Sequence, residues 1–334
     1  MNERIKWIDI VKFFGIFGIY MGHYGELAGK SYAFALTHLI ALFFFASGCM
    51  ENYSRETHFG KYVIKKIKTI MIPFWLFGAL ATVVTLIYGN YDFQYVKGAI
   101  KEVGLGVIRN TFPAASLWFL TCLFVMQLMF FFVRKVRIKI LMVVLGVVMY
   151  LIAVYVITPS PMWYPTWPYN VDSALYYMIY YIIGYCVFPY VMKLFVLDTK
   201  GKKIGVGISG ILASVYAICS YFGIDPFSYM NLPSEVIIFL PIISSCIVTW
   251  ALFVCARLVE DIDVLSNLGK NSLYLCGCEY IVKTLATCFF GIVGFNLVLP
   301  NPLSVYIYAA ILLLFANKYI VPIEKYILKK IVKA

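Results

Sequence analysis

The sequence contains few charged residues. Only 13% of its 334 residues are Asp, Glu, Lys or Arg and three are His, whereas 63% are hydrophobic and the mean hydropathy is +0.87. This composition excludes soluble globular proteins. Runs of about 20 apolar residues recur along the chain, whereas ten-residue stretches of alternating polarity do not, which indicates membrane-spanning helices and not barrel strands. We therefore expect an all-α, polytopic integral membrane bundle.

The sequence also lacks a Cys-x-x-Cys pair, although it has nine cysteines. Nearly all of these cysteines fall within apolar runs, where a free cysteine behaves as a small hydrophobic side chain. We therefore expect neither a disulfide framework nor a metal site.

The apolar runs predict about ten transmembrane helices in one domain, 1–334, without a fused soluble domain. Of the 28 Lys and Arg residues, 21 fall in the loops on the side of the N-terminus and four in the loops on the other side. Because positive charge accumulates on the cytoplasmic side, we expect both termini to be cytoplasmic. We expect a multi-pass protein of a bacterial plasma membrane, whose net charge of +12 reflects topology and not nucleic-acid binding. The predicted helices are 7–27, 32–50, 69–89, 116–133, 140–158, 173–192, 203–222, 235–256, 272–294 and 303–323.

The first apolar segment carries Asp9, Lys12 and His23. An ionisable side chain is costly inside a bilayer and is therefore a functional candidate. At a helical rise of about 1.5 Å per residue, Lys12 and His23 lie about 16 Å apart along the helix axis. The spacing predicts a cation near the cytoplasmic mouth and a titratable base in the outer half of the membrane.

A second histidine is expected at the depth of His23. His38 lies on the next helix, which runs back through the membrane, and Glu26 lies between the two histidines in the sequence. A lone intramembrane histidine often serves as an interhelical hydrogen-bonding group. Two histidines near one carboxylate favour a base with an orienting partner, so we expect His38 and Glu26 to help bind the acceptor.

Three further groups each allow two interpretations. Glu279 is either a self-neutralising partner of Lys283, four residues on, or a cross-helix partner of Lys12. The lysines of the inner loop before the third helix either set topology or neutralise a polyanionic donor; they are Lys65, Lys66 and Lys68. The aromatic segment 159–170, with Trp163 and Trp167, is either an interfacial belt or a stacking platform for a sugar.

Five short motifs, taken together and in order, resemble the family-3 membrane acyltransferases, which transfer acyl groups from acyl-coenzyme A to extracytoplasmic acceptors, commonly cell-surface sugars. These motifs are Asp9–Lys12 with His23, Phe43–Gly48, Ile72–Phe74, Leu117–Leu120 and Leu268–Tyr274. The resemblance implies a ten-helix core, a catalytic histidine at His23, and donor contacts from basic residues of helices one and three.

The chain departs from the family pattern at three places. Lys12 stands where arginine is usual, so a bidentate grip is replaced by a point charge. The basic run is likewise lysine where arginines are common, and Glu279 stands where the ninth helix often has a histidine.

From the residues and the resemblance we expect an O-acyltransferase that uses acyl-CoA, most simply acetyl-CoA, and modifies a surface polysaccharide or its lipid-linked precursor. A transporter or lipid-linked-sugar flippase is the alternative, because Lys12, His23, Glu279 and Lys283 could also line a substrate or proton path. The residues expected to act are His23, Lys12 and Asp9 in catalysis; Lys12, Lys65, Lys66, Lys68 and Trp118 at the donor; and His38, Glu26, Glu279, Trp163 and Trp167 at the acceptor.

Overall fold

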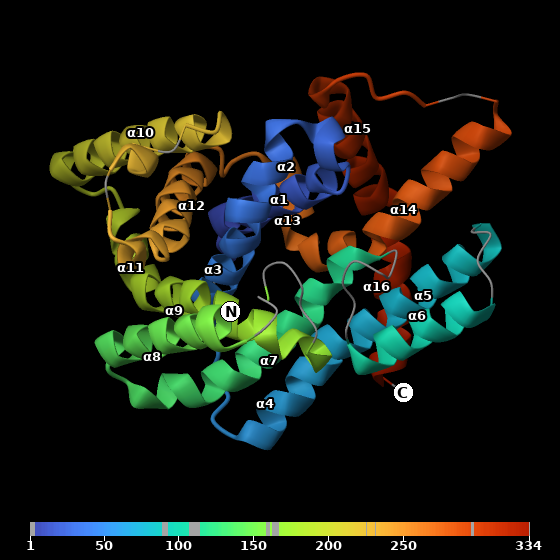
Figure 1. Cartoon of the computed structure of the whole chain (residues 1–334), viewed down its shortest axis with the longest axis horizontal. Coiled ribbons are helices and arrows are strands. Elements are labelled where there is room, and N and C mark those ends of the chain that lie inside the picture. Colours follow the sequence, from blue (N-terminus) through green and yellow to red (C-terminus); the bar gives the residue numbers. More distant parts are fainter. Residues whose placement is uncertain are drawn as a thin grey trace. The chain divides into compact units, whose positions relative to one another are not determined.

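The structure is a computed structural model that describes residues 4–88, 93–106, 114–157, 161, 167–224, 226–230, 232–294 and 297–333. These residues form helices and no strand, as the composition predicts. Figure 1 shows the helices in order along the chain. The chain divides into two compact units. Unit 1 comprises 1–53, 183–272 and 299–310, and unit 2 comprises 54–182, 273–298 and 311–334.

Within the described residues, nine helical segments are long and apolar enough to cross a membrane. They correspond to nine of the ten predicted helices, all but the first, and so confirm a polytopic all-α membrane bundle. The segments are Lys30–Glu51, Phe59–Tyr88, Ala115–Val136, Lys139–Val156, Pro168–Leu194, Lys200–Tyr221, Ser234–Leu258, Ser272–Ile292 and Pro302–Val332.

The first predicted helix, 7–27, is shorter in the structure. Helix α1 spans Lys6–Gly22, a length of 17 residues. Gly25 and Gly29 beyond it have φ of +56° and +58°, in the left-handed region that glycine adopts without steric cost. The chain therefore leaves the helix after Gly22 and turns before helix α2.

Unit 1 contains the N-terminal helices and the segment around α10 and α12. Helix α1 packs against α3, α12 and α13, and α10 packs along α12 (Figure 1). The elements that lie wholly in this unit are α1 (Lys6–Gly22), η1 (Gly25–Ala28), α2 (Lys30–Phe34), η2 (Ala35–Leu39), α3 (Ile40–Glu51), α10 (Lys200–Tyr221), η8 (Pro226–Tyr229), α11 (Ser234–Ile237), α12 (Leu240–Leu258) and α13 (Asp263–Lys270).

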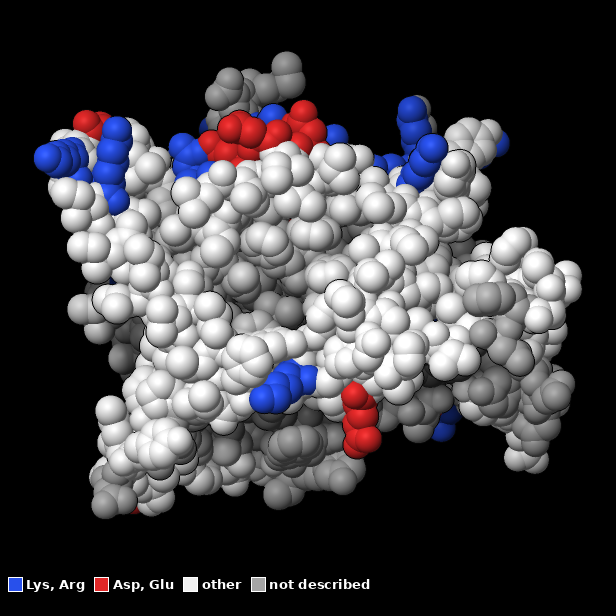
Figure 2. Space-filling model, turned by 90° about the horizontal axis from the view of Figure 1, so that it is seen from above, with Lys and Arg blue, Asp and Glu red and all other residues white. Residues whose placement is uncertain are grey.

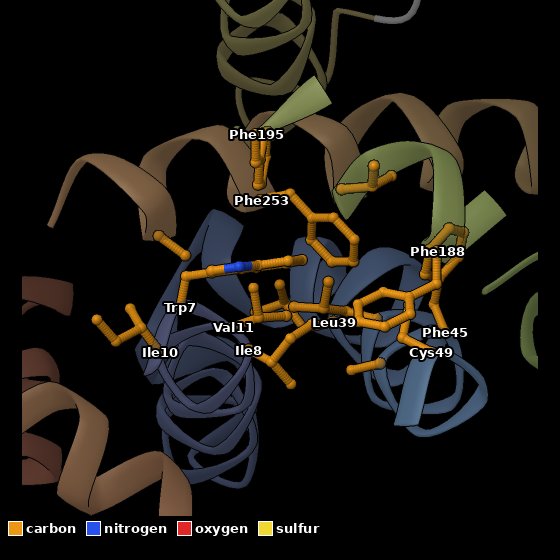
Figure 3. Packing of buried hydrophobic residues seen from close by; sticks show 14 of the residues in the cluster. Trp7, Ile8, Ile10, Val11, Leu39, Phe45, Cys49, Phe188, Phe195 and Phe253 are labelled. Atoms are coloured by element: carbon orange, nitrogen blue, oxygen red, sulfur yellow. The ribbon is translucent and has the colours of Figure 1, made fainter. Parts of the chain in front are cut away.

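The core of unit 1 is built around the indole ring of Trp7, which is 4% exposed. Its ring makes edge contacts with Phe195 at 5.0 Å and with Phe253 at 5.1 Å between centroids, and Phe253 in turn contacts Phe45 at 5.5 Å (Figure 3). Edge-to-face packing of this kind adds to the stabilisation from apolar burial. The cluster fixes the start of α1, and with it the side chains of Asp9 and Lys12.

Unit 2 contains the segment around α4 to α8 and the C-terminal helices. Helices α5 and α6 lie side by side (Figure 1), and α4 packs against α7. The elements that lie wholly in this unit are α4 (Phe59–Lys66), η3 (Ile67–Met71), α5 (Ile72–Tyr88), α6 (Phe93–Leu105), η4 (Ala115–Leu117), α7 (Trp118–Val133), η5 (Arg134–Val136), α8 (Lys139–Leu151), η6 (Ile152–Val156), η7 (Pro168–Asn170), η9 (Ala316–Ile320) and α16 (Val321–Lys333).

Three helices contribute residues to both units by the same division: α9 (Val171–Leu194), α14 (Ser272–Ile292) and α15 (Pro302–Phe315). Helix α6 lies where the sequence predicted only an outer loop, 90–115. With 13 residues it is too short to cross a bilayer, which explains why the search for apolar runs missed it.

The outer surface is suited to lipid. In the view of Figure 2 most surface residues are uncharged. Helix α10 exposes Ile208, Ile211 and Leu212 to 57%, 66% and 65%. Contiguous apolar exposure of this kind marks a membrane or protein contact, and the hydropathy of the chain favours the membrane.

Candidate functional site

The beginning of α1 carries an ionic cluster in which two partly exposed cations surround one buried carboxylate. Asp9 is 2% exposed and accepts hydrogen bonds from the guanidinium of Arg4, at 2.5 Å from Nε and 3.1 Å from Nη2. Nζ of Lys12 lies 3.4 Å from Oδ1 of the same carboxylate. A buried charge is tolerated when it is paired and hydrogen-bonded. Two cations on one anion leave the cluster with one net positive charge.

Helix α13 holds this cluster in place through a close backbone approach. A Cβ atom added at Gly269 would lie 1.6 Å from the carbonyl oxygen of Asp9, so any larger residue would force α13 away from α1. Gly269 belongs to the Leu268–Tyr274 motif and Asp9 to the Asp9–Lys12 motif. The structure therefore brings together two motifs that are about 260 residues apart in the sequence.

The expected catalytic residue, His23, lies at the opposite end of α1. It is the C-cap residue, its backbone N–H donates to the carbonyl of Ile19 at 3.1 Å, and its side chain is exposed. Glu26 follows in η1 and is also exposed. The imidazole is thus accessible to a ligand. Its role as the catalytic base stays a prediction.

The second histidine has a very different environment. His38 lies in the π-helical segment η2 and is 3% exposed. Its Nε2 lies 2.9 Å from Oγ of Ser220 on α10, and its Nδ1 lies 3.1 Å from Oγ of Ser245 on α12. Sequence reasoning missed both serines, because they lie 182 and 207 residues away and no local pattern links them to His38.

In unit 2, the lysines expected at the donor lie on α4 and η3. Lys65 and Lys68 are exposed and Lys66 is partly buried. Nζ of Lys66 lies 4.7 Å from the ring centroid of Tyr62, which is fully buried. The three lysines are therefore not equivalent: two are exposed, whereas the third packs on an aromatic ring.

A second cation, Arg134, packs on the same ring. In the sequence this residue contributed only to the charge bias that predicts topology. Cζ of Arg134 lies 5.3 Å from the Tyr62 centroid and 4.5 Å from that of Phe131, and its guanidinium donates to the backbone carbonyl of Glu56. The Glu56 carboxylate accepts the backbone N–H of His58, a hydrogen bond that lowers the pKa of Glu56. Arg134 therefore joins the basic segment to α7.

Trp118, the first residue of α7, lies in an aromatic cluster. It is 8% exposed, and its ring centroid lies 5.9 Å from that of Tyr177 and 6.4 Å from that of Phe119. Just before it, the Ser116 hydroxyl donates to the carbonyl of Cys276 at 3.0 Å. These contacts tie the beginning of α7 to α14; the expected contact of Trp118 with the donor stays a prediction.

Glu279 and Lys283 form an ion pair along α14. Glu279 is 3% exposed, and Lys283 follows it by four residues, so one helical turn brings the two charges together. The structure thus shows the local pair, the first of the two interpretations. The expected contact of Glu279 with the acceptor stays a prediction.

Of the two tryptophans expected at the acceptor, Trp167 is described and Trp163 lies outside the described residues. Trp167 is 44% exposed, and its backbone N–H donates to the carboxylate of Asp172 at 3.2 Å. Over the described part of the chain, no group of three or more His, Cys, Asp and Glu side chains is placed to bind a metal ion.

Comparison with known proteins identifies the family. A model of the "Acyltransferase domain" family matches residues 5–316 and so covers the motifs from α1 to α14. Searches of curated proteins and of solved structures found no significant match. Together with its apolar helices, the match over nearly the whole chain shows that this multi-pass membrane protein belongs to the acyltransferase 3 family and is a membrane acyltransferase.

Proposed function

We propose that the protein is an O-acyltransferase that moves an acyl group, most simply acetyl, from cytoplasmic acyl-CoA to a hydroxyl group outside the membrane. The acceptor is a cell-surface polysaccharide or its lipid-linked precursor. The donor is highly charged and cytoplasmic, whereas the acceptor is finished outside, so the enzyme must join two compartments.

The arrangement of α1 carries this proposal. Lys12 lies near the start of the helix in a cluster with one net positive charge, and His23 is the exposed residue at its end. The eleven residue steps from Lys12 to His23 correspond to about 16 Å of helix axis. One rigid element thus carries a cation for the donor and a base for the acceptor.

His23 acts as a general base. The acceptor hydroxyl gives its proton to His23, its oxygen attacks the thioester carbonyl, the carbon–sulfur bond breaks, and the coenzyme A thiolate leaves and is protonated. General-base catalysis of this kind contributes about 10²- to 10⁴-fold to the rate. A route through a transient acyl-histidine uses the same residue as nucleophile.

The donor's phosphates need positive charge on the cytoplasmic side. The exposed ammonium groups of Lys65 and Lys68 attract them as point charges. Lys12 contributes through its pair with Asp9, which holds the ammonium group in one place.

The deciding experiment follows the acyl group. Membrane vesicles that contain the protein receive radiolabelled acetyl-CoA on the cytoplasmic side, and mass spectrometry compares surface glycans of cells with and without the protein. We expect label in the glycan fraction, and none with His23→Ala. If the parent protein labels no glycan and the two glycan spectra agree, the proposal fails and the transporter alternative gains support.

A further inference from the structure

In unit 1 the imidazole of His38 lies between two serine hydroxyls and is hydrogen-bonded to both. Oγ of Ser220 lies 2.9 Å from Nε2, and Oγ of Ser245 lies 3.1 Å from Nδ1. The Ser245 hydroxyl also lies 3.2 Å from the backbone carbonyl of Thr37, to which it donates. The three side chains come from η2, α10 and α12, so the packing of three segments fixes their geometry.

The number of available protons selects one arrangement of these hydrogen bonds. Each serine hydroxyl has one proton and a neutral imidazole has one N–H. When Ser245 donates to the Thr37 carbonyl, it must accept from Nδ1–H, which leaves the Nε2 lone pair to accept from Ser220. This assignment satisfies all three contacts, whereas the opposite tautomer loses the bond to Thr37. His38 is therefore oriented by Ser245 and polarises the hydroxyl of Ser220.

The Ser220 hydroxyl has room for a substrate beside it. Ser220 and His38 both line a cavity of about 470 Å³ in unit 1, a size within the range of small-molecule sites. Phe34, Tyr216 and Tyr221 contribute aromatic walls. Lys30 also lines the cavity, and its Nζ is held by the carbonyl of Phe222 at 3.0 Å.

A serine within hydrogen-bonding reach of a base that a third group orients is the arrangement of an activated nucleophile. We propose that Ser220 is a nucleophile, activated by His38, that accepts an acyl group from an acyl thioester or another activated acyl ester in this cavity. The inference rests on the proposed function only for the identity of the donor.

The acyl group is transferred to Ser220 and then released in two steps, and only the second step needs a further reactant, a hydroxyl from water or an acceptor. Nε2 of His38 takes the Ser220 proton, Oγ attacks the carbonyl carbon, the carbon–sulfur bond breaks, and the leaving thiolate takes the proton from Nε2. In the return step a second hydroxyl, from water or an acceptor, gives its proton to Nε2 and attacks the ester, and Oγ leaves with that proton.

The test uses a serine-directed fluorophosphonate on the full chain in lipid nanodiscs, with peptide mass spectrometry to locate the adduct. We expect an adduct on Ser220 of the parent, none with Ser220→Ala, and an unchanged adduct with Ser214→Ala. Ser214 lies on the same helix outside the cavity lining and is the matched control. Replacing the base with His38→Gln should slow labelling about 100-fold or more.

Two outcomes overturn the inference: a parent chain whose Ser220 stays unlabelled, or labelling that His38→Gln leaves at the parent rate. The phosphonate reports on Ser220 whether or not acyl-CoA is the donor. A labelled Ser220 in a protein that transfers nothing from acyl-CoA would refute the proposed function and leave this inference standing. If the parent chain transfers acyl groups but forms no Ser220 adduct, this inference is refuted and the proposed function stands.

Discussion

The two histidines that the sequence placed at one membrane depth lie in contrasting surroundings. His23 ends α1 and is exposed, whereas His38 is 3% exposed and has both ring nitrogens hydrogen-bonded to serines. An exposed imidazole can meet a large acceptor and can be replaced at little cost in packing. A buried imidazole with fixed partners contributes to the fold as well as to chemistry. The contrast teaches that depth along a helix does not by itself define the role of a histidine.

The largest effect is expected at His23. His23→Ala should lower acyl transfer by about 10²- to 10⁴-fold, because the general base is lost, and should leave thermal unfolding near that of the parent. Radiolabel transfer and a melting curve in detergent measure the two quantities. His58→Ala, in an exposed loop position, is the control and should keep the parent activity. Near-parent transfer by His23→Ala would contradict the assignment of His23 as the catalytic base.

The next largest effect is expected at Asp9, in the ionic cluster at the start of α1, where a buried carboxylate can be compared with an exposed one. Asp9→Ala leaves Lys12 and Arg4 without their buried partner and should lower the free energy of unfolding by about 3 kcal/mol. Denaturant unfolding measures the change. Asp263→Ala is the matched control, because Asp263 pairs with Lys6 at 2.9 Å but its side chain is 83% exposed, so stability should stay close to the parent value. Equal losses in the two variants would show that burial of Asp9 is unimportant.

A smaller loss of stability is expected at His38. His38→Ala removes the partner of Ser220 and Ser245 and should lower the free energy of unfolding by about 1–3 kcal/mol. Acyl transfer should fall in part and not vanish, because His23 remains. Unfolding and transfer are measured on the same preparation. A variant with parent stability would show that the two hydrogen bonds do not matter to the fold.

The mildest effect is expected at the three lysines of α4 and η3 that the sequence assigned to the donor. Replacing Lys65, Lys66 and Lys68 together by alanine should weaken acyl-CoA binding about tenfold, since exposed ion pairs contribute up to about 1 kcal/mol each. Binding should also lose part of its salt dependence, because fewer charges remain to be screened. Binding curves at two salt concentrations test both points. Replacing Lys329 and Lys330 by alanine is the control. These lysines of α16 are exposed but have no predicted role at the donor, so the affinity should stay unchanged.

The local features of the chain were readable from the sequence. Apolar runs predicted α7 and α10 to within a few residues, because about 20 consecutive apolar side chains have few alternatives to a membrane helix. The four-residue spacing of Glu279 and Lys283 offered their ion pair as one of two interpretations, and the structure shows that pair. Helix α6 was missed because its 13 residues carry a mixture of apolar and charged side chains. The end of α1 was placed too late, because hydropathy does not register the turn that Gly25 and Gly29 make.

The sequence by itself determined that the protein lies in a lipid bilayer, that it is helical, which family it resembles, and that His23 and Lys12 are candidate residues. Hydropathy, charge bias and short motifs depend on residues that are close in the sequence, so they can be recognised without the tertiary structure. Only the tertiary structure decided that Gly269 packs on Asp9 and that Ser220 and Ser245 bond His38. These contacts join residues from different helices, often more than 180 positions apart, and depend on how helix faces pack. One sequence without its fold does not specify which faces meet.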